Sequence, residues 1–355
     1  MTGSFQLAML LLVPAPAIAQ TAPTVSPSGT STITSTSTLV IVPTLVRSTS
    51  GDLVYGLKPE DFRLTDNGIE QKITIEEVER QPLAVVVLMQ TGGTAPRHFE
   101  DFHNAGTMLR YMMGSSAYRI ALVTFDSQPQ DMWEFTSNIA DLNDAFTKPE
   151  AGDDGAAVVD AVDYAVNLLR QQPPQFRRII LLLSQPQDDG SKADTKGVIR
   201  RLGETNTTIY SVTFSPEKTW LRDQFTKERH GQPPYQLNPA GGPPIVGTFD
   251  LKAPLMAAVG AMREDTAAEV ATLSGGEHVR FEDKASLEHQ LGLIANHIPA
   301  RYILSFRPTS KQPGFHAISV RVVDRADPLS VAARTSYWAS GPAAPGSLKS
   351  SPPAQ

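Results

Sequence analysis

Two pairs of adjacent aspartates could together form a functional site in this sequence. Asp153-Asp154 come just before one apolar stretch, and Asp188-Asp189 come just after another. Carboxylate oxygens are the ligands that Mg²⁺ and Ca²⁺ prefer, so four of them in two loops could form an acidic metal pocket. Loop aspartates also stabilise turns and the amino termini of helices, and this structural role is the interpretation we favour.

The histidines and the common catalytic motifs offer no second site. His98 and His103 lie five residues apart, which is not the i, i+4 spacing of a helical zinc pair. His289 and His297 share one predicted helix but have no third ligand, so we expect them at the surface. Asp126 follows a predicted strand and is interpreted as a turn residue. The chain has no Gly-Lys-Ser/Thr phosphate loop, no Gly-x-Ser-x-Gly elbow and no identifiable pair of catalytic carboxylates.

Composition narrows the functional classes further. The 355 residues include 31 Lys and Arg against 37 Asp and Glu, a net charge of −6, so we predict no nucleic-acid partner. The absence of cysteine excludes disulfides, thiol catalysis and cysteine-bound zinc. We predict no cofactor. Apart from the apolar run near the amino terminus, no stretch approaches the length of a membrane span, so we predict no transmembrane helix.

Both ends of the chain are predicted to lie outside the folded part. Residues 1–19 contain the apolar run Leu7–Val13, too short for a membrane span, followed by Ala17-Ile18-Ala19, and together they resemble a secretory signal peptide. The alternative is a disordered apolar tail. Residues 20–38, rich in Ser and Thr, are predicted to be a linker, and residues 341–355 a disordered tail. We therefore expect an exported protein, periplasmic or extracellular.

Between these ends, two β segments flank an α/β segment. Residues 39–80 alternate short strands with turns, and Asp66-Asn67-Gly68 is a strong hairpin signal because Asn-Gly readily adopts positive φ angles. Residues 299–340 return to alternating strands, and we expect the two β segments to fold together into one small all-β domain. Five aromatic residues are predicted to fill the core of that domain: Tyr302, Phe306, Phe315, Tyr337 and Trp338.

Residues 81–298 alternate apolar strands with amphipathic helices. Strands that are apolar throughout are typical of a parallel sheet covered on both faces, so we predict a doubly wound, mostly parallel α/β sheet. Residues 215–253 are predicted to form a long irregular segment, with a Pro/Gly-rich insertion at 228–248 beside Trp220. We expect strands at 83–89, 118–126, 177–184, 207–214 and 278–281, and helices at 98–113, 139–146, 156–169, 192–202, 254–273 and 285–297.

These segments resemble the von Willebrand factor A family, in the subgroup described from Acidobacteria. LKPEDFRLTDNGIEQKI (57–73) is similar to the lead-in of that subgroup, and ARYILSFRPTSKQPGFHAISVRV (300–322) with ARTSYWA (333–339) is similar to its tail. The resemblance covers roughly residues 39–339. It implies a domain that binds a partner protein through a divalent metal held by Asp-x-Ser-x-Ser, a Thr from a second loop and an Asp from a third.

The metal-ligand pattern of the family is lost in this chain. Of the family's five ligand positions, only one, Thr94, keeps a hydroxyl group. Both carboxylates are replaced by neutral amides, which do not offset the dehydration of a dication. The five positions, in the order of the family pattern, are Gln90, Gly92, Thr94, Ala156 and Gln185. We predict that they form a degenerate metal site in which Gln90 and Gln185 approach one another, directly or through water.

The resulting hypothesis is an exported, non-enzymatic interaction module. It would bind an unknown protein partner through the loops at the carboxyl ends of its strands, without the usual divalent metal. One alternative is a metal-dependent adhesion domain that uses Asp153, Asp154, Asp188 and Asp189. A second alternative is a hydrolase of the cell envelope, which would require a deep pocket holding a strongly perturbed titratable group.

Overall fold

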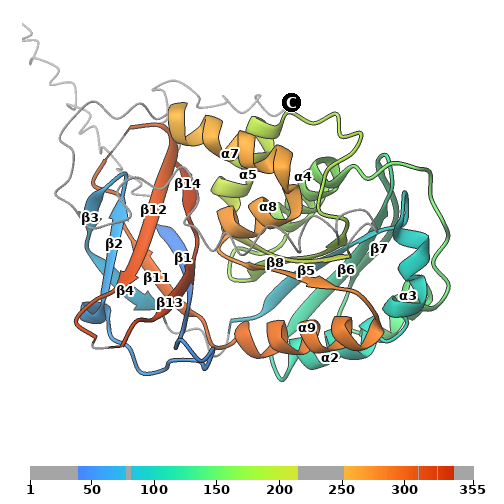
Figure 1. The fold of residues 1–355 in the computed structure, drawn as a ribbon, viewed down its shortest axis with the longest axis horizontal. Helices are drawn as coiled ribbons and strands as arrows, with labels where there is room; N and C mark the ends of the chain where they lie inside the picture. The colour runs from blue at the N-terminus through green and yellow to red at the C-terminus, as the bar shows by residue number, and fades with distance from the viewer. Residues whose placement is uncertain (1–38, 77–80, 215–251, 311, 326, 340–355) are drawn as a thin grey trace, which may run out of the picture. The chain divides into compact units, whose positions relative to one another are not determined.

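The computed structural model describes most of the chain between residues 39 and 339 (Figure 1). The described ranges are 39–76, 81–214, 252–310, 312–325 and 327–339. Several predicted features lie outside the described residues: the signal peptide 1–19, the linker 20–38, the insertion 228–248 with Trp220, and the tail 341–355. In the described residues, no helix is long and apolar enough to cross a membrane.

The α/β part is built on a six-stranded sheet. Its strands are β5 (Leu83–Gln90), β6 (Tyr118–Phe125), β7 (Pro129–Thr136), β8 (Arg177–Ser184), β9 (Thr207–Phe214) and β10 (Glu277–Phe281). They lie in the order β10-β9-β8-β5-β6-β7, and all neighbours are parallel except β6 and β7. The predicted mostly parallel α/β sheet is therefore confirmed.

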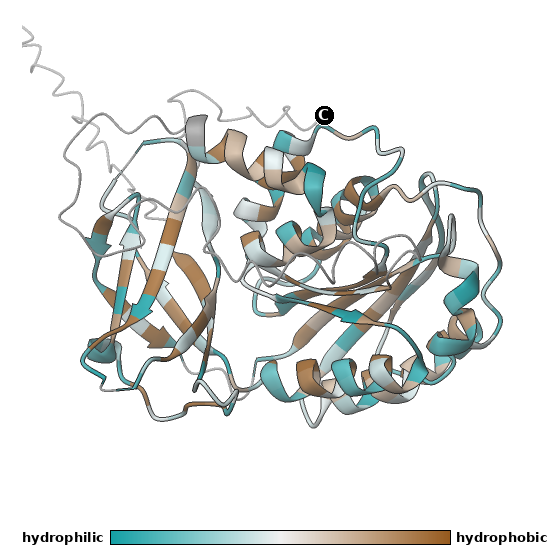
Figure 2. Ribbon diagram, viewed as in Figure 1, coloured by the Kyte–Doolittle hydropathy of each residue, from teal (hydrophilic) through white to brown (hydrophobic). Residues whose placement is uncertain are grey.

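The central strand β5 shows why these strands are apolar throughout. Each of its eight residues is buried. Val85, Val87 and Met89 point into the core on one face of the sheet, while Val86 and Leu88 point into the core on the other. Side chains alternate between the two faces of a strand, so a strand covered on both faces needs apolar residues at every position. Figure 2 shows this as brown strands in the central layer.

Helices cover both faces of this sheet. One face carries η2 (Ala95–His98), α1 (Phe99–Phe102), α2 (Ala105–Met113), η3 (Ile139–Leu142), α3 (Asn143–Thr147) and α9 (Lys284–His297). The other carries α4 (Val158–Arg170), α5 (Thr195–Thr205), α7 (Lys252–Glu264) and α8 (Thr266–Ser274). These two helical layers lie above and below the sheet in Figure 1.

Two predicted helices are wrong because each is divided. The helix expected at 98–113 is interrupted between α1 and α2. The helix expected at 254–273 is divided at Asp265, whose side chain accepts a hydrogen bond from the backbone N–H of Ala268 at 2.9 Å and so begins α8. An aspartate in extended conformation that accepts such a bond is a typical helix N-cap, and it starts a new helix there.

The edge strand β7 was not predicted. Its segment, PQDMWEFT, is polar at most positions and is half-buried or exposed throughout. It pairs antiparallel with β6 through two register irregularities. A strand at the edge of a sheet needs few apolar residues, and its charges protect the open edge from pairing with other chains. This strand forms one wall of a cleft.

The segments before and after the α/β part pair with each other in two antiparallel sheets. The strands are β1 (Val40–Arg47), β2 (Phe62–Asp66), β3 (Ile69–Gln71), β4 (Ile73–Glu76), β11 (Tyr302–Phe306), β12 (Gly314–Val322), β13 (Ser330–Ala333) and β14 (Ser336–Ala339), with η1 (Pro59–Asp61) before β2. The sheet orders are β13-β1-β11-β4 and β14-β12-β2-β3. Residues of both sheets share one apolar core. The domain limits at 80, 298 and 340 stay predictions.

The hairpin between β2 and β3 is confirmed. Asn67 and Gly68 have φ angles of 48° and 82°, and Asp66 pairs with Ile69 across the turn. Two neighbouring segments depart from the simple alternation of strands and turns expected over residues 39–80. Residues 53–55 make only an isolated bridge from Leu53 to Arg47, and the strands on either side of Lys72, β3 and β4, belong to different sheets.

The predicted aromatic core of the β part is wrong for two of its five members. Phe306 and Tyr337 lie in that core, and Tyr302 packs against it. Phe315 and Trp338 belong instead to the core of the central sheet, among side chains of α5 and α7. Side chains on successive strand residues point to opposite faces. Trp338 therefore faces the α/β part while Tyr337 faces the β part, and the two parts pack through β12 and β14.

His297 is buried, so the prediction of a surface histidine is wrong at this position. Only 7% of it is exposed, and its Nδ1 lies 2.8 Å from Glu277 Oε2. The buried guanidinium of Arg301 donates to Glu277 Oε1 at 2.5 Å. Burial raises the pKa of Glu277, but its bonds to His297 and Arg301 outweigh burial and hold that pKa below its usual value. His289 is exposed, as predicted.

A second buried histidine, His316, anchors the β part. Its Nδ1 lies 2.8 Å from Asp66 Oδ1 and its Nε2 lies 2.9 Å from the carbonyl oxygen of Gln312. Asp66 and the Gln312 carbonyl are both acceptors, so these two contacts favour the protonated form of the ring. Tyr337 donates to the other carboxylate oxygen of Asp66 at 2.8 Å. Burial lowers the pKa of His316, but the bonds to Asp66 and Gln312 outweigh it and raise that pKa above 6.5.

Stability is therefore expected to fall at alkaline pH. The folded-state pKa of His316 is raised, so its contribution is complete below pH 6.5 and is lost as the pH rises through the folded-state value. Urea unfolding at about pH 6 and about pH 8.5 measures this change. His316→Gln should cost about 2 kcal/mol at the lower pH and flatten the profile. The matched control, exposed His289→Gln, should leave the profile as it is, and equal slopes for both variants would contradict the assignment.

Candidate functional site

The predicted site residues lie at the carboxyl ends of neighbouring parallel strands. Gln90 is the last residue of β5, Gln185 follows the last residue of β8, and Ala156 comes shortly before α4. In open α/β sheets the loops at this edge form the usual ligand crevice. The chain therefore places these residues where the resemblance implied a site.

Gln90 and Gln185 bond to each other directly, which confirms their predicted approach. The backbone N–H of Gln185 donates to Gln90 Oε1 at 2.8 Å. Gln90 Nε2 donates to Gln185 Oε1 at 3.3 Å and to the carbonyl oxygen of Gly92 at 3.0 Å. Gln90 is fully buried, so these bonds satisfy polar groups that water does not reach. The two amides link the β5 and β8 loops.

The backbone of residues 152–155 packs over Gly92. A Cβ atom at Gly92 would lie 2.3 Å from the carbonyl oxygen of Gly155 and 2.7 Å from that of Asp153. The next residue, Gly93, has a φ of +57° and donates its N–H to the Asp153 carbonyl at 2.8 Å. Position 92 therefore has no room for the serine of the family pattern. Glycine is required here because two backbones meet.

Asp126 organises this loop and was underestimated as a simple turn residue. Only 4% of it is exposed. Its Oδ1 accepts hydrogen bonds from Gln128 N at 3.2 Å and Gln130 Nε2 at 2.8 Å, and its Oδ2 accepts one from Asp153 N at 3.2 Å. A Cβ atom at Gly152 would lie 2.7 Å from Asp126 Oδ2. The carboxylate thus holds the β6–β7 turn and the 152–155 loop together.

The remaining two predicted positions, Ala156 and Thr94, lie in the same group of loops but take no part in the amide pair. Ala156 forms an antiparallel bridge with Asp189, with N–H to carbonyl distances of 3.0 and 2.8 Å. The Thr94 hydroxyl is buried and has no hydrogen-bond partner in the described part of the chain. In the described residues no side-chain hydrogen bond joins Thr94 to Gln90 or Gln185.

The donor set at these positions does not fit a divalent metal. Gln90 Oε1 and Gln185 Oε1 already accept hydrogen bonds, Gly92 cannot carry a hydroxyl, and no carboxylate takes part. Mg²⁺ and Ca²⁺ sites in proteins rely on several oxygen ligands that include carboxylates. The amide pair occupies the ligand positions with bonds that close the loops on themselves.

Two of the four aspartates of the alternative acidic site, Asp153 and Asp188, are engaged in structural hydrogen bonds. Asp153 Oδ1 accepts from the backbone N–H groups of Ser127 and Gly155, and its Oδ2 accepts from Ser127 Oγ. These bonds, first that of the Ser127 hydroxyl, lower the pKa of Asp153. Across the described ranges no group of three His, Cys, Asp or Glu side chains is arranged to hold a metal.

Asp188 takes a similar role at the start of α4. Its Oδ1 accepts from Val159 N at 2.9 Å and from Ser191 Oγ at 2.5 Å. Asp154 and Asp189 are exposed. The carboxylates of Asp153 and Asp188 thus act as turn and helix caps, the ordinary role that the sequence favoured.

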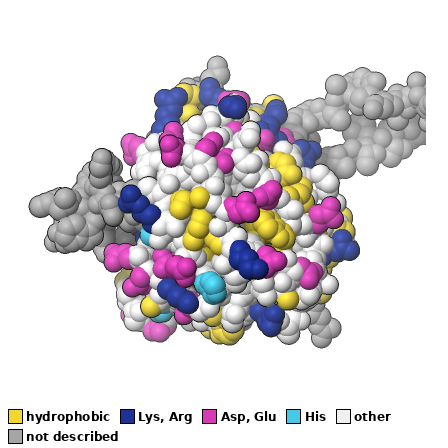
Figure 3. Space-filling view, turned by 90° about the vertical axis from the view of Figure 1, so that its right-hand side faces the viewer, with side chains coloured by type: hydrophobic (Ala, Val, Ile, Leu, Met, Phe, Trp, Pro, Cys, Tyr) yellow, Lys and Arg dark blue, Asp and Glu magenta, His cyan; other side chains and the backbone are white. Residues whose placement is uncertain are grey.

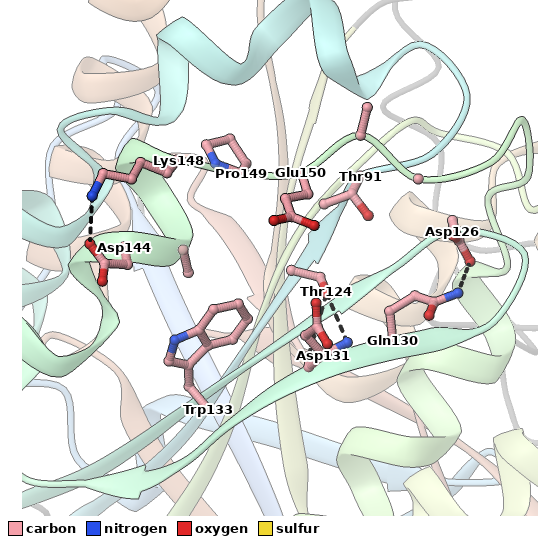
Figure 4. A pocket seen from close by; sticks show the side chains of 13 residues that line it. Thr91, Thr124, Asp126, Gln130, Asp131, Trp133, Asp144, Lys148, Pro149 and Glu150 are labelled. Carbon is pink, nitrogen blue, oxygen red and sulfur yellow. Dashed lines mark hydrogen bonds and ion pairs between the residues drawn. The ribbon is translucent and has the colours of Figure 1, made fainter.

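A cleft that was not predicted from the sequence opens beside the amide pair. It has a volume of about 430 Å³ and lies between β7 and the segment that leads from α3 to Gly152. Figure 4 shows Trp133 and Asp131 rising from β7 and Glu150 facing them across the opening. Buried Thr91 and Thr124 form its floor. The polar segment of β7 shows no clear strand pattern in the sequence, so the cleft that it borders could not be predicted.

Comparison with solved structures gives distant likenesses. BatB, a conserved hypothetical protein from Bacteroides thetaiotaomicron, is 11% identical, with 60% of this chain and 97% of that chain covered and a TM-score of 0.36. Proximal thread matrix protein 1 from the mussel byssus is 12% identical, covering 65% and 49%, with a TM-score of 0.39. A variant of the PilB minor pilin from Streptococcus sanguinis is 11% identical, covering 63% of each chain, with a TM-score of 0.38. The chain thus spans about half of the mussel protein. No curated protein matches the chain.

A family model locates part of the α/β region. Its matched residues run from Arg97 to 229, so Ala156 and Gln185 lie inside the match while Gln90, Gly92 and Thr94 precede it. The matched range contains β6, β8 and β9 of the mostly parallel sheet described above. Residues 97–229 thus match the von Willebrand factor type A domain.

Proposed function

We propose that this chain is a non-enzymatic interaction module that binds a protein partner through its loop face without a divalent metal. The loop face consists of the residues after β5, β6 and β8, including Gln90, Gln185 and the 152–155 loop. The von Willebrand factor type A match supports the class of module. The amide pair of Gln90 and Gln185 is the observation that carries the metal-independent part of the proposal.

Three contacts support a loop face that is ordered before a partner arrives. Gln90 links the β5 and β8 loops, Asp126 links the β6–β7 turn to the 152–155 loop, and Ala156 pairs with Asp189. Preorganised loops lose little conformational entropy on binding. In a metal-dependent site the ion would provide this order, whereas here hydrogen bonds between amides and backbone provide it.

Membership of the Acidobacteria-type subgroup and export are further parts of the proposal. The lead-in at 57–73 and the tail at 300–322 and 333–339 support the subgroup. The apolar run and the Ala-x-Ala pattern in residues 1–19 support export. A partner would then be met in the periplasm or outside the cell.

Site-specific photo-crosslinking in the organism that makes the protein tests this function. A photoreactive residue placed at exposed Asp154, on the loop face, should give a discrete adduct with a second protein, and EDTA should not remove it. The matched control at exposed Arg119 lies near the opposite end of β6 and should give none. Adducts that form only from Arg119, or that EDTA abolishes, would refute the proposal.

Divalent metals are expected to leave the protein unchanged. Since the amide pair and Gly92 provide no ligand set, millimolar Mg²⁺, Mn²⁺ or Ca²⁺ should shift the melting temperature by less than about 1 °C. Isothermal titration calorimetry should show no saturable heat. Stoichiometric binding in the micromolar range would contradict this result. If Asp153→Asn or Asp188→Asn then abolished that binding, the acidic alternative would replace the proposal.

A further inference from the structure

The cleft beside the amide pair has the electrostatics of a cation site. Four carboxylates line it, from Asp126, Asp131, Asp144 and Glu150, against the single cation of Lys148. Figure 3 looks at the side of the molecule on which α3 and β7 lie, and there Asp and Glu side chains, together with some Lys and Arg, lie beside exposed hydrophobic groups. A concave surface with one sign of charge concentrates ligands of the opposite charge.

Two of these carboxylates have partners within the protein. Asp126 accepts three hydrogen bonds from N–H groups, so its charge is already stabilised. Asp144 lies 3.8 Å from Lys148 Nζ, in a pair whose side chains are both 80% exposed. This pair is solvated and lies at the rim, as Figure 4 shows.

The carboxylates of Asp131 and Glu150 are available to a ligand. In the described residues no ion pair or hydrogen bond engages either carboxylate. The bonds of Asp131 to Thr124 use its backbone only. The two side chains come from opposite walls, one from β7 and one from the segment before Gly152, and Figure 4 shows both at the same opening. A ligand between them would meet two negative charges.

The third wall is the indole ring of Trp133. It packs against the core between the sheet and α2, which fixes the ring, yet part of its surface remains open to the cleft. A tryptophan face attracts a cation through its quadrupole, and arginine stacks on such a ring more often than lysine does. The combination of an aromatic face and two carboxylates in a cleft is independent of the degenerate metal positions.

We propose that this cleft binds the guanidinium group of an arginine side chain presented by the partner polypeptide. The guanidinium stacks on Trp133 and its N–H groups donate to Glu150 and Asp131. The volume of the cleft, about 430 Å³, lies in the range of small-ligand pockets. The inference rests on the proposed function, because it names the chemistry by which the loop face recognises a partner.

The test uses the full chain and follows the indole ¹H–¹⁵N signal of Trp133, assigned with Trp133→Phe. The probe is the peptide amide Gly-Arg-Gly-Arg-Gly, and its control carries citrulline in place of arginine, which is neutral with a similar shape. We expect a saturable shift with the arginine peptide and at least about tenfold weaker binding of the citrulline peptide. N-acetyl-arginine amide should bind more weakly than the peptide.

Charge-neutral variants locate the contact. Glu150→Gln and Asp131→Asn should each weaken the arginine peptide about threefold to fivefold, as expected for exposed ion pairs. Glu204→Gln removes the same charge from an exposed site on α5 and should leave the affinity unchanged. Equal binding of the two peptides, or unchanged affinity in Glu150→Gln, would overturn the arginine assignment.

The two proposals fail separately. If adducts form at Asp154 but the arginine peptide does not shift Trp133, the arginine site is wrong and the interaction module stands. If the peptide binds saturably but no adduct forms at Asp154, the partner-binding function of the loop face is wrong. A free arginine derivative that binds as tightly as the peptide would point to a small-molecule ligand and overturn the polypeptide assignment.

Discussion

Gly92→Ser is expected to destabilise the protein by on the order of 3 kcal/mol, although serine is the residue that the family pattern has at this position. The new Cβ would lie 2.3 Å from the Gly155 carbonyl oxygen and 2.7 Å from Asp126 Cβ. These atoms belong to backbone or to a side chain held by three hydrogen bonds, so they cannot move independently. The 152–155 loop would have to detach. Chemical unfolding followed by circular dichroism measures the loss.

The matched control is Gly292→Ser on α9. A Cβ atom there meets nothing within 4 Å, so the same substitution should be neutral or slightly stabilising because serine forms helices better than glycine. Adding Gln90→Asp to Gly92→Ser should not restore metal binding, since the loop still fills the space. A stable Gly92→Ser variant, or a double variant that binds Mg²⁺ stoichiometrically, would contradict the packing of the loop over this position.

The amide pair was predictable because it depends on topology alone. Parallel neighbouring strands end at the same edge of the sheet, so residues that follow β5 and β8 must meet there. The identity of Gln90 and Gln185 then decided what the contact would be. The fully apolar sequence of β5 fixed the parallel, two-sided sheet in the same way, since every residue had to be buried.

The loop over Gly92 could not be predicted because its cause lies far away in the sequence. Whether Gly92, Gly152 and Gly155 are required depends on which other atoms of the folded chain approach them. The sequence alone does not show whether a loop glycine is closely packed or exposed to solvent. Strand β7 and the cleft were missed for a related reason. A half-exposed edge strand has no apolar periodicity, so the strand that carries Trp133 and Asp131 could not be predicted. The position of these two side chains at a cleft could therefore not be predicted either.

Buried polar residues show a third limit of prediction from the sequence. His297 was expected at the surface, and Arg301 is of a residue type that is usually exposed. Each is buried beside Glu277, which is 20 residues or more away in the sequence. The division at Asp265 is different. It is an N-cap directly before a helical stretch, and the sequence contained the signal that could have found it.

Arg334→Leu should destabilise the protein by about 4 kcal/mol, the largest effect expected outside the loop face. Arg334 is 2% exposed, and burial lowers its pKa to about 10, so it stays charged at neutral pH. In the described residues no carboxylate pairs with it. Its charge is stabilised instead by four oxygen acceptors: Ser336 O, Ile41 O, Asn206 Oδ1 and Gly203 O, at 2.6–3.2 Å.

These acceptors belong to both parts of the chain, which is why the effect should be large. Ile41 and Ser336 lie in β1 and β14, whereas Gly203 and Asn206 lie at the end of α5. Leucine would remove the donor that these four acceptors share at a buried junction. Arg334→Lys should recover less than half of the loss, because one ammonium cannot reach acceptors on three elements.

Unfolding curves distinguish a junction from an ordinary buried residue. If Arg334 couples the two parts, the wild-type protein should unfold in one transition, while Arg334→Leu should show two, with the β part separating from the central sheet. Exposed Arg110→Leu on α2 makes the same chemical change and should cost less than about 0.5 kcal/mol in a single transition. A single transition with wild-type stability in Arg334→Leu would mean that Phe315 and Trp338 alone hold the β part against α5 and α7, and that the guanidinium is dispensable.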